Sequence, residues 1–262
     1  LTAAICFTAL FGFCISIRKY ELKIEKINFN QCLEILKEDR YIFYSAIITN
    51  LYTATGIVLL GAFGSTKDVG FYVAAQSIVL LAQNVVLGAL NPVFYPIFSK
   101  AFHESRDNAI ELIKKIIPVN IYISLIVLVG MLVFGPFLIL LMYGGDFFES
   151  ILMFIILCFG LFLKFYGAIF GGQIMLNIAM DNIFVRIQIY TSILSVVLNT
   201  IGLYYFDLDG KWVAGVWVFS EFLITASQYF YLKYKGYSMF SWNMLRISSF
   251  VSGLKLVKKG AF

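Results

Sequence analysis

Residues 151–179 read ILMFIILCFGLFLKFYGAIFGGQIMLNIA, an apolar stretch that contains a single charged residue, Lys164. The stretch is longer than the roughly 20 residues that a transmembrane helix needs, so we expect it to cross a bilayer. Because a charge exposed to lipid at that depth is unfavourable, Lys164 should face other helices, water or a ligand. The stretch therefore predicts one helix of a membrane-embedded bundle.

The composition of the whole chain agrees with this expectation. Hydrophobic residues make up 61% of its 262 residues and charged residues 13%, which leaves too little polar surface to cover a water-soluble globule. Apolar runs between charged breaks predict spans at residues 1–17, 41–64, 70–98, 117–142, 151–179, 184–206 and 213–232. We expect an all-α, polytopic membrane helical bundle with six full transmembrane helices and one partial N-terminal helix.

Basic residues are concentrated on alternate connections between these spans. All but three of the 20 Lys and Arg residues fall in the connections on one side, at residues 18–40, 99–116, 180–186 and 233–262. The exceptions are Lys67 and Lys211 on the opposite side and Lys164 within a span. By the positive-inside rule, the basic connections should be cytoplasmic. Since the basic residues flank apolar spans and form no stripe of their own, nucleic acid is not expected as a partner.

The same segmentation predicts the organisation of the chain. Residues 1–17 form a partial span, which suggests a fragment that begins inside a transmembrane helix. Residues 18–40 form a cytoplasmic linker, with an amphipathic helix expected over 29–40. Residues 41–232 form a six-helix transmembrane bundle, and residues 233–262 a basic cytoplasmic tail. The opposite connections are too short for a catalytic domain.

Polar or small residues recur at helical spacing in four of the spans. The sets are Gln76, Gln83, Asn84 and Asn91; Gly160, Lys164, Gly167 and Gly171; Gln188, Ser192, Ser195 and Asn199; and Glu221, Thr225 and Gln228. Each set lies on one face of its helix. Such faces either hold helices together or line a wet cavity. The candidate cavity residues are Lys164, Glu221, Gln76, Gln83, Asn84, Asn91, Gln188, Asn199 and Asn50.

Lys164 and Glu221 are the ionisable residues within these polar faces. Placing either charge in lipid would cost roughly 3 kcal/mol or more, so each should face water, a substrate or the other. Lys164 is a candidate ligand for the phosphate of a lipid-linked substrate, and its alternative roles are an ion pair or snorkelling. Glu221 is a candidate proton acceptor in a transport cycle or a partner of Lys164.

Two further features bear on mechanism. Pro92 and Pro96 interrupt the span at 70–98, where proline either acts as part of a gate or makes a static kink. The sequence has no paired carboxylates, no Ser/His/Asp set and no cluster with metal-ligand spacing, so we expect no catalytic site, no metal site and no cofactor. The lone His103 lies in the charged connection 99–116, where a solvated role is expected.

Residues 50–100, NLYTATGIVLLGAFGSTKDVGFYVAAQSIVLLAQNVVLGALNPVFYPIFSK, carry a family resemblance. They resemble the start of the C-terminal half of O-antigen-type polysaccharide flippases, the Wzx/RfbX group of the multidrug/oligosaccharidyl-lipid/polysaccharide exporter superfamily. The matching features are Leu51-Tyr52, Leu60-Gly61, Val69-Gly70-Phe71-Tyr72 with Ala74-Ala75, and Tyr95-Pro96 before Ser99-Lys100. A later segment, with Gly210, Val213-Ala214-Gly215-Val216 and Ser220-Glu221, resembles the last outer turn and last helix of that family.

The resemblance implies a multi-pass transporter of the bacterial cytoplasmic membrane, not an enzyme. Residues 1–17 would end the N-terminal bundle, and this missing bundle would be a partner together with membrane lipids. The implied substrate is an undecaprenyl-pyrophosphate-linked oligosaccharide repeat unit, moved to the outer leaflet by alternating access between two bundles. Many relatives carry an acidic residue near Gly56, in the helix that spans 41–64. This chain has none in that span, so coupling to a cation through this helix is in doubt.

Two other functions stay open on the sequence alone. A related antiporter of cationic drugs or metabolites would need an acidic cavity, and the spans offer Lys164 and Glu221, one of each sign. A membrane polysaccharide polymerase is similar in hydropathy, but such enzymes usually carry a large outer loop with catalytic basic residues, which this chain lacks.

Overall fold

The computed structural model describes residues 40–237 and, outside that range, residues 11, 15, 33, 249, 250 and 253. The chain divides into two units, Leu1–Arg40 and Tyr41–Phe262. The long helices belong to the second unit, apart from Arg40 at the start of the first of them. The partial span predicted at 1–17, the helix predicted at 29–40 and most of the tail at 233–262 lie almost entirely outside the described residues.

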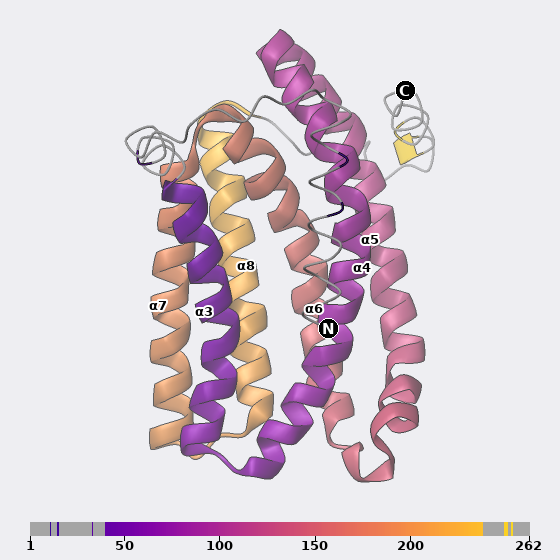
Figure 1. Cartoon of the computed structure of the whole chain (residues 1–262), viewed down its shortest axis with the longest axis vertical. Helices are drawn as coiled ribbons and strands as arrows, with labels where there is room; N and C mark the ends of the chain where they lie inside the picture. The colour runs from indigo at the N-terminus through magenta and orange to yellow at the C-terminus, as the bar shows by residue number, and fades with distance from the viewer. Residues whose placement is uncertain are drawn as a thin grey trace. The chain divides into compact units, whose positions relative to one another are not determined.

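The regular structure of the described residues is entirely helical (Figure 1). The long helices are α3 (Arg40–Phe63), α4 (Thr66–Glu104), α5 (Arg106–Tyr143), α6 (Ser150–Gly167), α7 (Asp181–Tyr205) and α8 (Gly210–Tyr234). A 3₁₀ turn, η1 (Gly145–Phe147), connects α5 to α6. After Gly167 the chain stays helical through a π-helical segment, η2 (Ala168–Met175), and a second 3₁₀ turn, η3 (Leu176–Ile178).

Four of the described helices are long and apolar enough to cross a membrane. They are α4, α5, the continuous segment Ser150–Ile178 and α7. The expected all-α membrane bundle is therefore confirmed, whereas the count of six full spans stays a prediction. Of the other two long helices, α8 falls short of these requirements. In α3, an apolar helix is found over Tyr52–Phe63, within the part of α3 in which the structure describes every side chain. In α8, Glu221 and several Trp, Tyr and Gly residues dilute the apolar character.

The outer face of α5 shows why this bundle needs a bilayer. Val129, Val133, Phe137 and Leu141 follow one another at four-residue spacing along the helix, and all are exposed. A contiguous apolar face of this kind is unfavourable in water and suits contact with lipid tails. The interior-facing side of the same helix includes the buried Asn120 and Ser124.

The connection predicted at 99–116 is helical almost throughout. Helix α4 continues to Glu104, so His103 lies in its last turn and not in a loop. Ser105 has an extended backbone, which ends α4. Its Oγ accepts a hydrogen bond of 3.1 Å from the main-chain N–H of Asn108, and this bond caps the N-terminus of α5. With 39 residues, α4 is about 58 Å long. That is nearly twice the hydrocarbon thickness of about 30 Å, so part of α4 must extend beyond the membrane.

The apolar core forms two clusters at different levels of the bundle. The first includes Tyr72, Phe154 and Trp217. The second includes Phe98, Ile174 and Leu232. Along α8, Trp217 belongs to the first cluster and Leu232 to the second. The polar residues of α8 lie between them, at Glu221, Thr225 and Gln228.

Candidate functional site

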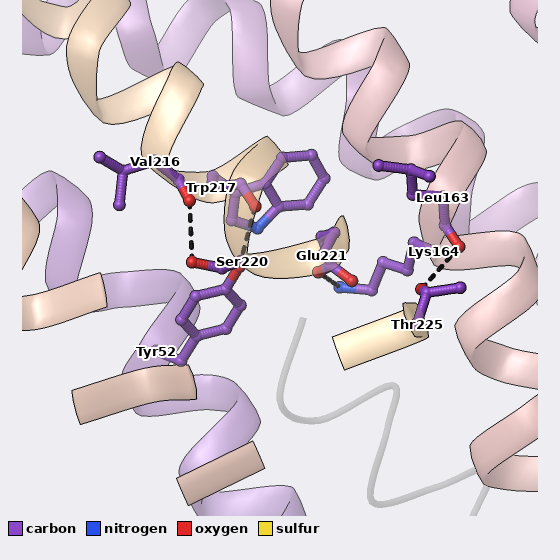
Figure 2. Close-up of polar contacts among 8 residues, drawn as sticks. All are labelled: Tyr52, Leu163, Lys164, Val216, Trp217, Ser220, Glu221 and Thr225. Carbon is purple, nitrogen blue, oxygen red and sulfur yellow. Dashed lines mark hydrogen bonds and ion pairs between the residues drawn. The ribbon is translucent and has the colours of Figure 1, made fainter. Parts of the chain in front are cut away.

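Lys164 on α6 and Glu221 on α8 form an ion pair inside the bundle (Figure 2). The Nζ atom of Lys164 lies 3.3 Å from Oε1 of Glu221, and the two side chains are 18% and 5% exposed. The same Nζ lies 5.5 Å from the centroid of the Trp217 ring. A carboxylate and an aromatic face are both favourable partners for an ammonium group.

Hydrogen bonds from neighbouring side chains connect the helices around this pair (Figure 2). Thr225 Oγ1 donates to the main-chain oxygen of Leu163 at 3.2 Å, which links α8 to α6. The hydroxyl of Tyr52 donates to the main-chain oxygen of Trp217 at 3.2 Å, which links α3 to α8. These contacts satisfy polar groups that lipid or apolar side chains would leave unpaired.

The glycines of α6 and η2 allow α8 to approach closely enough for the ion pair. A Cβ atom at Gly160 would collide with the ring of Trp217. A Cβ at Gly167 would lie 3.1 Å from Thr225 Oγ1, and one at Gly171 would lie 2.7 Å from Gln228 Nε2. The glycine face predicted on this helix therefore packs against the polar face of α8, as small residues do at helix interfaces in membranes.

A cavity of about 390 Å³ lies beside the ion pair. Its walls come from α3, α4, α7, α8 and the continuous segment from α6 to η3. The lining residues include Tyr52, Asn91, Tyr95, Lys164, Gly172, Gln173, Phe184, Gln188, Ser192, Glu221, Ile224 and Gln228. This volume is within the range of ligand-binding cavities. The wall offers one cation, one anion, several amides and the hydroxyl groups of Tyr52, Tyr95 and Ser192 on a surface that is otherwise apolar.

The structure brings together part of the predicted set. Lys164, Glu221, Asn91 and Gln188 line the cavity. The other described candidates, Gln76, Gln83, Asn84 and Asn199, are not among its lining residues.

For Gln76 and Asn199 the reason is depth, because a helix face runs the length of the helix whereas the cavity occupies one level. Gln76 and Asn91 are 15 residues apart on α4, which is about 22 Å along the axis. Similarly, Asn199 lies 11 residues beyond Gln188 on α7, about 16 Å away. Gln76 and Asn199 are buried elsewhere in the bundle, and Asn84 is exposed.

Three other candidates have different outcomes. The side chain of Asn50 lies outside the described residues. Pro92 and Pro96 are carried inside the continuous helix α4, and their neighbour Tyr95 lines the cavity. A gating role for the two prolines stays a prediction.

Gln173 is the most informative cavity residue that the sequence pattern missed. In an α-helix, the nine positions between Lys164 and Gln173 correspond to two and a half turns, which would place Gln173 on the opposite face. The π-helical segment Ala168–Met175 takes more residues per turn and changes this phase. Gln173 is thereby brought to the cavity, where its Nε2 donates to Asn91 Oδ1 at 3.2 Å.

A second cavity, also of about 390 Å³, lies between α3 and α7. It is lined mainly by aliphatic side chains, among them Ile48, Ile193 and Val197. Tyr52 and Ser192 line both cavities. The polar cavity is therefore adjacent to an apolar one.

The described residues include no group of three or more His, Cys, Asp or Glu side chains that could hold a metal ion. What the cavity offers is non-covalent binding. Lys164 can contact an anion, Glu221 a cation or a proton, and the amides can accept and donate hydrogen bonds.

Comparison with known proteins identifies a family. The family described as polysaccharide biosynthesis protein matches residues 1–152, which is more than half of the 262 residues. Neither the curated proteins nor the solved structures gave a match.

Proposed function

The chain belongs to the polysaccharide biosynthesis protein family, and from this membership and the cavity beside Lys164 we propose that it transports lipid-linked oligosaccharides. The substrate would be an oligosaccharide repeat unit on undecaprenyl pyrophosphate. The protein would move it across the bacterial cytoplasmic membrane by alternating access, together with an N-terminal bundle, for O-antigen or a related surface polysaccharide. In this proposal the protein is a flippase and not an enzyme.

The observation that carries this proposal is the ion pair between Lys164 and Glu221 at the cavity wall. In the absence of substrate, Glu221 neutralises the buried ammonium group. A pyrophosphate carries more negative charge and more acceptor oxygens than one carboxylate, so it can compete with Glu221 for Lys164. Substrate binding would then exchange one partner of Lys164 for another, so that the ammonium group stays paired at bilayer depth.

The adjoining apolar cavity supports an amphiphilic substrate. A lipid-linked sugar has a charged head group and a long isoprenoid tail, and the two must lie in different surroundings. The polar cavity suits the head group, and the aliphatic walls between α3 and α7 suit the part of the tail nearest to it. The shared residues Tyr52 and Ser192 lie where these parts would join.

One observation favours a second candidate, an antiporter of cationic drugs or metabolites. Glu221 is a buried carboxylate at the cavity wall, and such a group can attract a cation. Its pairing with Lys164, however, leaves this part of the wall neutral overall. An organic cation would have to displace the ammonium group, which is a closer and more compact partner for the carboxylate. The anionic substrate therefore remains our proposal.

A complementation experiment tests the proposed function. Deletion of the full-length gene should abolish long-chain surface polysaccharide and leave lipid-linked repeat units on the cytoplasmic leaflet. Lys164→Gln should restore less than about a tenth of the polysaccharide, since it loses a charge-assisted contact of about 2 kcal/mol. Lys164→Arg, which keeps the charge, should restore more. The matched control is Lys114→Gln on the exposed face of α5, which should complement fully. Normal surface polysaccharide in the deletion strain would reject the flippase assignment.

A further inference from the structure

Two of the residues that line the cavity have a buried carboxamide oxygen without a hydrogen-bond donor. These oxygens are Oε1 of Gln173 and Oε1 of Gln228, for which the described part of the chain provides no partner. The two side chains are only 4% and 1% exposed, and both residues line the cavity beside the ion pair. A buried acceptor without a donor is unfavourable, so a pair of them in one cavity requires an explanation.

A hydrogen bond orients the carboxamide of Gln173, and close packing positions that of Gln228. Gln173 donates through Nε2 to Asn91 Oδ1 at 3.2 Å, so its oxygen must be on the other side of the group. Gln228 lies against the glycines of the neighbouring helix. Its Nε2 is 2.7 Å from the position of a Cβ at Gly171, and its Oε1 is 3.7 Å from the corresponding position at Gly167. The oxygen of Gln173 is therefore an acceptor in a defined position, and the carboxamide of Gln228 packs against the chain at Gly167 and Gly171.

These acceptors are at a different level of the cavity from the charges. Glu221 and Gln228 are seven residues apart on one face of α8, which is about 10 Å along the helix. Gln173 lies nine residues beyond Lys164 on the other wall, within the π-helical segment. The cavity therefore has an ionic end at Lys164 and Glu221 and an acceptor end at Gln173 and Gln228.

We propose that Gln173 and Gln228 form a sugar-binding subsite that distinguishes the sugar-loaded carrier lipid from the bare carrier. This inference rests on the proposed function. Sugar hydroxyl and acetamido N–H groups are uncharged donors, and they would satisfy both oxygens while the pyrophosphate contacts Lys164. Ionised pyrophosphate offers only acceptors, and the isoprenoid tail offers neither donors nor acceptors. A bare carrier would bind at Lys164 but leave both oxygens unpaired.

The consequence is selectivity for cargo. A site built to hydrogen-bond a substrate discriminates against an analogue that lacks the donor, because its own buried polar groups are then unsatisfied. The bare carrier shares the pyrophosphate and the tail with the loaded one, so neither of these parts can provide the discrimination. The acceptor end of the cavity can provide this discrimination, which would reduce unproductive movement of the unloaded lipid.

Binding measurements with two lipids test this subsite. The probes are undecaprenyl pyrophosphate and the sugar-bearing lipid extracted from the deletion strain, each added to the purified full-length protein in nanodiscs. The wild-type protein should bind the sugar-bearing lipid at least about tenfold more tightly. Gln173→Met and Gln228→Met should each weaken binding of the sugar-bearing lipid about fivefold and leave the Kd for undecaprenyl pyrophosphate unchanged. Lys164→Met should weaken binding of both lipids.

Gln83→Met is the matched control. Gln83 also has an Oε1 atom without a partner among the described residues, but it does not line the cavity. This variant should bind both lipids as the wild-type protein does. An effect of Gln83→Met equal to that of the two cavity variants would overturn the subsite.

Two results separate failure of the subsite from failure of the proposed function. Equal affinity of the wild-type protein for both lipids would overturn the subsite and leave the flippase proposal intact, and this comparison needs no variant to fold. Binding of neither lipid would reject the flippase proposal and the subsite with it. Tighter binding of tetraphenylphosphonium than of either lipid, weakened by Gln173→Met or Gln228→Met, would assign the two oxygens to a cation instead.

Discussion

The ammonium group of Lys164 lies 3.3 Å from the carboxylate of Glu221, but the two side chains are not equally buried. Glu221 is 5% exposed and Lys164 is 18% exposed. An ammonium group left alone at this site would therefore keep more contact with the cavity than a carboxylate left alone. The two single neutral variants should therefore differ in stability.

We expect Lys164→Met to lower the free energy of unfolding by about 3 kcal/mol, because it leaves a buried carboxylate without a partner. Glu221→Gln should lower it by less. The double variant Lys164→Met/Glu221→Gln should be more stable than the sum of the two single effects predicts. Chemical denaturation of the purified protein in detergent measures all three values.

The surface pair of Lys115 and Glu111 provides the control for this cycle, since both side chains are well exposed. Lys115→Gln should change the free energy of unfolding by less than about 1 kcal/mol. Strict additivity of the Lys164 and Glu221 variants would show that the two charges do not interact in the folded protein.

Two adjacent glycines provide a second prediction. A Cβ at Gly171 would collide with the ring of Phe184 and lie 2.7 Å from Gln228 Nε2, whereas a Cβ at Gly172 meets no atom within 4 Å. We expect Gly171→Ala to destabilise the protein by about 1–3 kcal/mol, because α7 or α8 must move to accommodate the methyl group. Gly172→Ala should be close to neutral. Thermal unfolding followed by intrinsic fluorescence compares them, and equal destabilisation by both substitutions would contradict the packing described for this segment.

The sequence predicts the apolar architecture well because hydropathy and charge report directly on the bilayer. The span predicted at 151–179 differs by one residue at each end from the helical segment Ser150–Ile178. The connection at 99–116 shows the limit of this approach. Lys and Glu are good helix formers, so a change from apolar to charged composition marks the membrane boundary and not the end of a helix. The signal for the true break was Ser105, with Asn108 three residues later.

The site was predicted only in part, for two physical reasons. Periodicity assigns a residue to a helix face but not to a depth, so Gln76 and Asn91 were placed together although only Asn91 lines the cavity. The same periodicity assumes α-helical geometry throughout. The π-helical segment after Gly167 has more residues per turn, so it changes which positions lie on the same face. Without knowledge of this segment, Gln173 could not be assigned to the face of Lys164.

A third prediction concerns the end of α8. Arg106 at the start of α5 donates through Nη2 to the main-chain oxygen of Lys235 at 2.6 Å, and its guanidinium lies 4.4 Å from the centroid of the Tyr237 ring. Arg106→Gln removes a charge-assisted hydrogen bond of about 1.5 kcal/mol, so local opening at this end should become about tenfold more frequent. Limited trypsin digestion after Lys233 and Lys235 should accelerate accordingly.

Lys114→Gln is a suitable control for the digestion, because it also removes an exposed positive charge from α5. It should leave cleavage after Lys233 and Lys235 unchanged. If Arg106→Gln also left the cleavage rate unchanged, the contact with Lys235 would not hold the end of α8 in place.

The orientation of the bundle provides the last prediction. Residues 99–116, where α4 ends and α5 begins, form a basic joint with Lys100, Arg106, Lys114 and Lys115. The turn between α5 and α6, from Tyr143 to Glu149, contains no basic residue. By the positive-inside rule, the joint should be cytoplasmic and the turn should face outward. In a background without the native cysteines, Asp146→Cys should react with a membrane-impermeant maleimide in intact spheroplasts. His103→Cys should react only after permeabilisation, because it lies in the last turn of α4, beside that joint. The reverse labelling pattern would place the basic joint outside and contradict the orientation predicted from the charges.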